Sequence, residues 1–152
     1  MFLIPPQVEP VIEDIYTDFT ISAGSSRELI KDEEMIAFLG NIIIVSRSAS
    51  ITIEHTINNQ VWKQSIQSLI NWGLDERVDN YWYCTKAVGG VDPYYTAVYQ
   101  GNGEPYTRYK LVLYNDTAGD IIIRFVGTQR WWLKGMGKEL PEEMYKKLGF
   151  AL

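Results

Sequence analysis

The clearest hydrophobic pattern in the chain is a strict alternation of apolar and polar residues over positions 51–57. The residues that would share one face of a strand there are Ile51, Ile53, His55 and Ile57. A weaker alternation from residue 15 to residue 21 places Ile15, Thr17, Phe19 and Ile21 on one face. Residues 42–45 are β-branched throughout, which favours a strand covered on both faces. Alternation with a period of two is typical of half-buried strands, so these segments predict a mostly β chain.

The remaining elements are short and are separated by turn residues. Further strands are expected at 28–30, 81–86, 94–100, 109–114 and 121–126, with 115–120 as a hairpin connection. Trp62, Ile66, Leu69 and Ile70 have helical spacing and predict one short helix, for which a strand is the alternative. Pro141, the acids after it and the following lysines predict a short C-terminal helix. No strand–helix–strand period recurs, so the fold class is an antiparallel β-sandwich of jelly-roll type.

The two ends differ in composition from the middle of the chain. Residues 1–15 combine three prolines with apolar side chains, which predicts an extended N-terminal arm. Residues 16–127 are expected to form the sandwich domain, and residues 128–152 a C-terminal docking segment. We expect at least one end to dock on another subunit, because both are apolar yet too interrupted by Pro and Gly to form a large core.

Charge and cysteine content exclude several classes of protein. The net charge of −5 argues against unaided binding of nucleic acid and of anionic membranes. Cys84 is the only cysteine, so an intrachain disulfide is impossible. The N-terminus lacks the basic residues of a signal peptide, and no apolar run approaches the ~20 residues that span a bilayer. These features predict a protein made in a cytoplasm that is not inserted into a membrane.

The sequence offers no recognisable catalytic constellation. His55 is the only histidine, and neither it nor Cys84 has the partners that a nucleophilic or zinc site needs. The acidic cluster at 32–34 is interpreted as a solvated turn. We therefore predict a protein that is not an enzyme and needs no cofactor or metal, in which His55 and Cys84 have no chemical role. An enzyme whose site leaves no sequence signature is a third possibility.

Aromatic residues make up 13% of the chain, and eight of them lie between Tyr81 and Tyr109. Tyr and Trp suit core packing, protein interfaces and sugar stacking alike, and all three readings stay open. Trp131 and Trp132 are adjacent, so in a strand one of them must find cover outside the domain core. The residues predicted for an interface are Phe2, Leu3, Ile4, Tyr94, Tyr95, Tyr99, Trp131, Trp132 and Phe150.

Three stretches, residues 18–27, 40–45 and the pair 109–115 with 119–127, suggest a family. In their order they resemble small β-sandwich virion proteins of tailed bacteriophages, of the head-decoration or the neck and tail accessory type. The resemblance covers residues 15–58 and 107–127. It implies a structural component of the virion that contacts copies of itself, as a trimer, and other virion proteins. The alternative is a carbohydrate-binding β-sandwich that uses the Tyr/Trp-rich face to bind a glycan.

Overall fold

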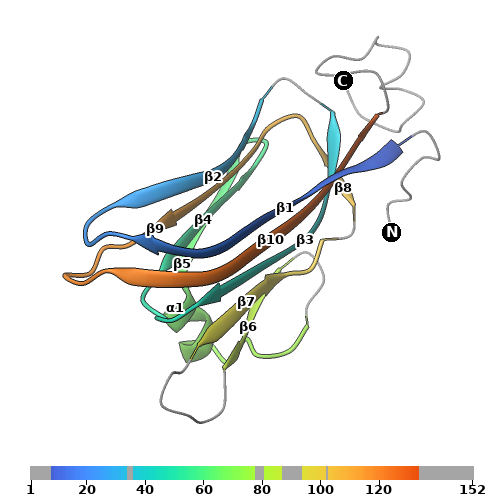
Figure 1. Cartoon of the computed structure of the whole chain (residues 1–152). Helices are drawn as coiled ribbons and strands as arrows, with labels where there is room; N and C mark the ends of the chain where they lie inside the picture. Colours follow the sequence, from blue (N-terminus) through green and yellow to red (C-terminus); the bar gives the residue numbers. More distant parts are fainter. Residues whose placement is uncertain (1–7, 34–35, 78–80, 87–93, 102, 134–152) are drawn as a thin grey trace.

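Two antiparallel sheets and one short helix make up a computed structural model of the chain (Figure 1). The structure describes residues 8–33, 36–77, 81–86, 94–101 and 103–133, with the backbone alone for 8–13, 86, 132 and 133. The six-stranded sheet contains β1 (Val8–Ile21), β10 (Ile121–Leu133), β3 (Ala37–Ser46), β7 (Tyr95–Tyr99), β6 (Trp82–Lys86) and β8 (Glu104–Tyr106). The four-stranded sheet contains β2 (Ser26–Asp32), β9 (Tyr109–Tyr114), β4 (Thr52–Ile57) and β5 (Gln60–Ser65). The prediction of a mostly β sandwich is confirmed.

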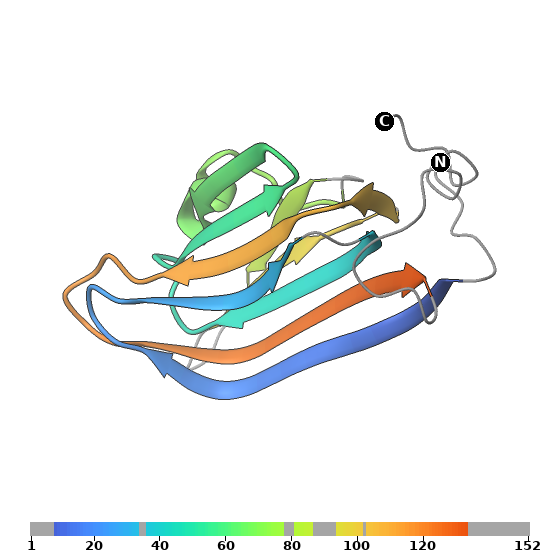
Figure 2. The ribbon, with the colours of Figure 1, turned by 90° about the horizontal axis from the view of Figure 1, so that it is seen from above.

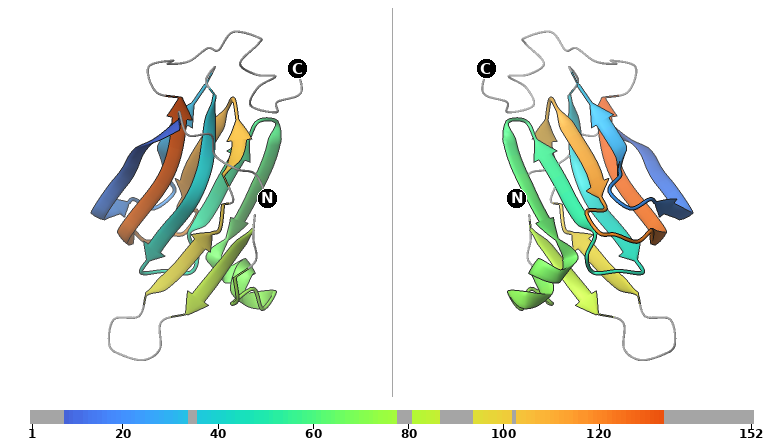
Figure 3. Two further views of the ribbon diagram at one scale, coloured as in Figure 1. Left: turned by 90° about the vertical axis from the view of Figure 1, so that its right-hand side faces the viewer. Right: turned by 90° about the vertical axis from the view of Figure 1, so that its left-hand side faces the viewer.

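The strand order is that of a jelly roll. The first sheet runs β1-β10-β3-β7-β6, with β8 paired to β3, and the second runs β2-β9-β4-β5. β1 pairs with β10, β2 with β9, β3 with β7 and β4 with β5, as in a long double hairpin rolled into two layers. Figure 2 shows these layers from above, and Figure 3 lets the order be followed from both sides. β6 and β8 are additions to this eight-strand plan.

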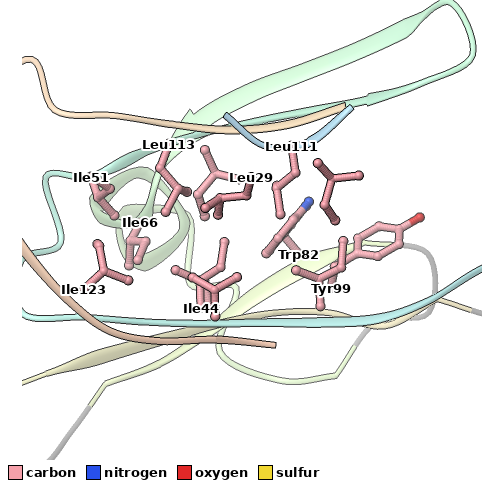
Figure 4. Close-up of a cluster of buried hydrophobic side chains, with 14 of the residues drawn as sticks. Leu29, Ile44, Ile51, Ile66, Trp82, Tyr99, Leu111, Leu113 and Ile123 are labelled. Atoms are coloured by element: carbon pink, nitrogen blue, oxygen red, sulfur yellow. The ribbon is translucent and has the colours of Figure 1, made fainter. Parts of the chain in front are cut away.

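The core lies between the two sheets and is built from the alternating residues of their inner faces (Figure 4). Ile51, Ile53 and His55 are buried, and Ile57 packs against the same core, so the alternation at 51–57 is confirmed. Ile44, Leu111 and Ile123 are also fully buried in this core, and Phe19 packs against it.

The predicted helix is shorter than expected. Trp62 belongs to strand β5, and α1 covers only Ile66–Asn71, close to β6 and β7 in Figure 1. Asn58 has a φ of 54°, and the turn it forms returns the chain along β4, so pairing with β4 overrides the helical spacing. The helix begins where the Ser65 hydroxyl accepts a hydrogen bond from the Ser68 N–H at 3.1 Å.

The connection at 115–120 is not a hairpin, because β9 and β10 lie in different sheets. Asn115 is fully buried at this corner, and its amide nitrogen donates to the carbonyl oxygens of Ile21 and Gly119. Its backbone N–H donates to the Ser25 carbonyl at 2.8 Å. Asn115 therefore fastens the β9–β10 corner to the neighbouring β1–β2 corner.

Strands β1 and β10 run across the segment boundaries that were predicted after residues 15 and 127. The expected arm at 1–15 and the docking segment at 128–152 each contribute to the six-stranded sheet, since Val8 pairs with Leu133 and Ile15 with Gly127. Both boundaries thus fall inside strands whose hydrogen bonds continue across them. The first seven residues of the arm and the predicted C-terminal helix lie outside the described residues.

Candidate functional site

The outer face of the four-stranded sheet is polar and charged. Glu54 of β4 accepts a hydrogen bond from the Tyr114 hydroxyl at 2.5 Å and pairs with Lys110 at 3.4 Å. The donation from Tyr114, supported by Lys110, holds the pKa of Glu54 below its usual value. Lys63 of β5 lies over the Tyr114 ring, 4.1 Å from its centroid. Such a surface is suited to contact with water.

The outer face of the six-stranded sheet carries a row of uncharged, mostly apolar residues instead. Ile15 of β1 pairs with Gly127 of β10, which pairs with Ile43 of β3, and the register continues to Val98 of β7 and Tyr83 of β6. Ile15 is 56% exposed and Ile43 is 37% exposed. We define the apolar row as Ile15, Gly127, Ile43, Val98, Tyr83 and Phe125. It crosses all five strands of the main sheet order and carries no charged side chain.

Phe125 fills the gap that Gly127 leaves in this row. A Cβ atom at Gly127 would come within 2.7 Å of the Phe125 ring, so glycine is needed for the ring to lie where it does. Beside the ring, Ile15, Ile43 and Asn41 line a shallow groove of about 180 Å³. The apolar row is therefore an uneven surface with a ridge and a groove.

The sequence pattern predicted more burial for Ile15 and for residues 42–45 than the structure shows. Ile15 was expected to share a face with Phe19. The backbone between them is irregular, since Asp18 has a φ of 46°, and Tyr16 is the partly buried residue in place of Ile15. Tyr16 packs against the core, and its hydroxyl donates to the Leu29 carbonyl at 3.1 Å. Ile43 is exposed, so the prediction of a strand covered on both faces is wrong for this chain on its own.

The predicted interface residues fall into four groups. Tyr94 is exposed, whereas Tyr95 is partly buried against the core. Tyr99 is only 4% exposed and belongs to the core, which removes it from the contact surface. Trp131 is partly buried, with its ring over Gly40. The residues about which the structure gives no side-chain information are Phe2, Leu3, Ile4, Trp132 and Phe150.

Half of the eight aromatic residues from Tyr81 to Tyr109 form the core around His55. They are Trp82, Tyr99, Tyr106 and Tyr109, all buried. The His55 ring lies 4.5 Å from the Tyr99 ring, and its Nδ1 is 2.8 Å from the Tyr109 hydroxyl. Because that hydroxyl has no other described partner, we infer that it donates to Nδ1 and that the imidazole proton is on Nε2.

Burial gives His55 a measurable role in pH stability. Desolvation lowers its pKa from 6.5 to about 3. Between these values the unfolded chain binds a proton that the folded protein excludes, so stability is lost as the pH falls. The slope from this one group has a limit of about 1.4 kcal/mol per pH unit.

We expect a His55→Gln variant to lose stability more slowly than the parent between pH 6.5 and pH 3. Urea unfolding of both proteins at several pH values measures the difference in their free energies of unfolding. The carboxylates titrate in both proteins, so their effect cancels in this difference. Parallel pH curves would show that His55 titrates normally in the folded protein.

Cys84 is the second residue considered for chemistry. It lies on β6 with its side chain in the core, and desolvation raises the pKa of its thiol to about 11. Cys84 pairs with Ala97 of β7, and its backbone N–H donates to the Leu74 carbonyl at 2.7 Å. Among the described residues, no three metal-binding side chains are grouped together.

The structure contains a buried charge cluster that the sequence pattern did not predict. Arg130 of β10 forms ion pairs with Asp14 of β1 and, at 2.5 Å, with Asp32 of β2. Tyr106 of β8 donates to the same Asp32 carboxylate at 2.6 Å. Asp32 belongs to β2 and is largely buried, so the reading of 32–34 as a solvated turn is wrong for this residue. The cluster joins the two sheets and is structural in character.

Comparisons with other proteins add no identification. α1 is the single helix of the described ranges, and it is too short to cross a membrane. A search of the sequence against models of protein families finds no match, and a search of curated proteins finds none either.

Proposed function

We propose that this protein is a non-enzymatic structural subunit of a multi-copy assembly, of the kind found in tailed-phage virions. The observation that carries the proposal is the contrast between the two outer faces: one is charged, and the other bears the apolar row. Soluble monomers rarely expose contiguous apolar patches larger than about a few hundred Å², and such patches mark interaction sites. The virion setting comes from the resemblance over residues 15–58 and 107–127.

A second copy of the chain is the partner that suits this face. Each copy carries a net charge of −5, so a contact between two copies costs least where the contact surface itself carries no charge. The apolar row offers such a surface. Two sheets pack face to face through interdigitating side chains, and the ridge of Phe125 beside its groove provides the relief for this. The proposed contact thus buries the row between copies.

Ile43→Glu is expected to dissociate the assembly, because it places a charge in the centre of the contact. The matched control is Trp72→Glu, which adds the same charge at the most exposed large apolar residue of the described ranges, outside both sheets. Light scattering over a concentration series measures the mass of each protein.

The parent and Trp72→Glu should form the same oligomer, while Ile43→Glu should remain a monomer with an unchanged circular dichroism spectrum. A parent that is monomeric at all concentrations would contradict the proposal. So would dissociation by Trp72→Glu alone, because the contact would then lie elsewhere.

A further inference from the structure

A second feature, independent of the apolar row, lies where the edges of the two sheets meet. Strands β4 and β5 of one sheet and β6 and β7 of the other enclose a cavity of about 270 Å³. Pockets for small-molecule ligands begin at roughly 300 Å³, so this cavity has room for one ring. Its lining consists of His55, Ile57, Gln60, Val61, Trp62, Tyr81, Trp82 and Tyr99, with no charged side chain among them.

Aromatic rings form most of the wall. Trp62 of β5 and Trp82 of β6 stack across the two sheets, with ring centroids 5.6 Å apart and planes 10° apart. Tyr81 meets Trp62 edge-on at 6.3 Å. Figure 4 shows Trp82 and Tyr99 extending into the space between the sheets. Because the two indoles already stack on one another, no open slot between them is left for a flat base or aromatic ring.

Three nitrogens of the lining residues are buried without a hydrogen-bond partner among the described residues. They are Nε2 of His55 and Nε1 of Trp62 and Trp82. Both indole nitrogens are donors, and in the tautomer inferred above, with Tyr109 donating to Nδ1, the His55 Nε2 is a donor as well. All three nitrogens are enclosed by protein atoms, so a ligand oxygen reaches them only when the side chains around the cavity shift. A buried donor without an acceptor costs free energy, which favours binding of a ligand rich in acceptor oxygens.

We propose that this cavity binds one uncharged sugar ring, the terminal residue of a glycan, with His55, Trp62 and Trp82 as the recognition residues. A pyranose has an apolar C–H face that lies against an indole ring, and its hydroxyl oxygens accept hydrogen bonds from N–H donors. Its lack of charge matches the lining, in which a carboxylate or ammonium ion would be desolvated without a counter-charge. Gln60, exposed at the edge of the cavity, contributes an amide to the outer hydroxyls.

The test uses the full chain labelled with nitrogen-15, because each indole N–H gives its own NMR signal. The probes are the methyl glycosides of glucose, galactose, mannose, N-acetylglucosamine and rhamnose, with glucuronate as the charged comparison and glycerol as the non-ring polyol. At least one neutral glycoside should shift the Trp62 and Trp82 signals in a saturable manner and leave Trp72 unchanged. Glucuronate and glycerol should not.

Variants then locate the site. Trp62→Leu should weaken binding about tenfold or more, because it removes a stacking surface and a donor. Gln60→Ala changes an exposed residue, so it preserves the fold and should weaken binding a few-fold. Trp72→Phe is the matched control and should bind like the parent. No saturable shift with any neutral glycoside, or an unchanged Kd in Gln60→Ala and Trp62→Leu, would overturn the proposal.

Discussion

Replacing Arg130 by methionine is expected to lower the free energy of unfolding by about 3–5 kcal/mol. The Arg130 side chain is only 7% exposed and lies between two carboxylates, Asp14 and Asp32, that are 25% and 13% exposed. Methionine keeps the apolar stem but removes the charge, and the two acids are then left close together without a cation. Breaking a buried pair in this way costs more than the pair contributes, because the remaining charges stay desolvated.

The matched control is Arg124→Met on the same strand. Arg124 pairs with Asp18 at 3.1 Å, but both side chains are well exposed, so its loss should cost less than about 1 kcal/mol. Urea unfolding at neutral pH measures both variants. Adding Asp32→Asn to Arg130→Met should restore part of the loss, because it removes one of the stranded charges. Equal losses from Arg130→Met and Arg124→Met would show that the cluster is not buried as described.

Truncating Ile53 to alanine is expected to cost about 2–5 kcal/mol. Ile53 is fully buried on β4, where Leu113 of β9 lies opposite, so the lost methyl groups leave a cavity between the sheets. Val61→Ala on the neighbouring strand is the control, since Val61 is 64% exposed and leaves no cavity. Its effect should be within about 0.5 kcal/mol. Urea unfolding measures both variants. If the dependence of the unfolding free energy on urea concentration is the same for both, the difference between their midpoints gives the difference in stability. Similar midpoints would mean that the inner face of β4 is not the core.

The two proposals concern separate surfaces and can fail separately. The apolar row lies on the outer face of the six-stranded sheet, while the cavity opens where β5 and β6 face each other. Ile43→Glu should therefore leave sugar binding intact, and Trp62→Leu should leave the oligomer intact. A protein that assembles by one surface and binds a glycan by the other would unite the two functions that the sequence alone presented as alternatives.

The local sequence pattern was sufficient to predict a strand where one face is buried and the other is exposed to water. The alternation at 51–57 identified the inner residues of β4 correctly, because a one-residue slip would bury Thr52 and Glu54 instead. The turn between β1 and β2 also fits its composition, since Gly24 has a φ of 70°, which few other residues adopt. Fold class followed from such features without knowledge of any strand partner.

The partners themselves were decided by tertiary structure. The β1–β10 ladder joins Ile15 to Gly127, and the charge cluster joins Asp14 to Arg130. No local pattern encodes contacts over such separations, so Asp32 was assigned to a solvated turn although it is a buried partner of Arg130. The same holds for the short helix, since Trp62 has helical spacing but is held in β5 by pairing with His55 of β4. The sequence determined which residues are apolar and where the chain turns, whereas only the folded sheets decided which apolar residues lie inside, because burial depends on long-range pairing.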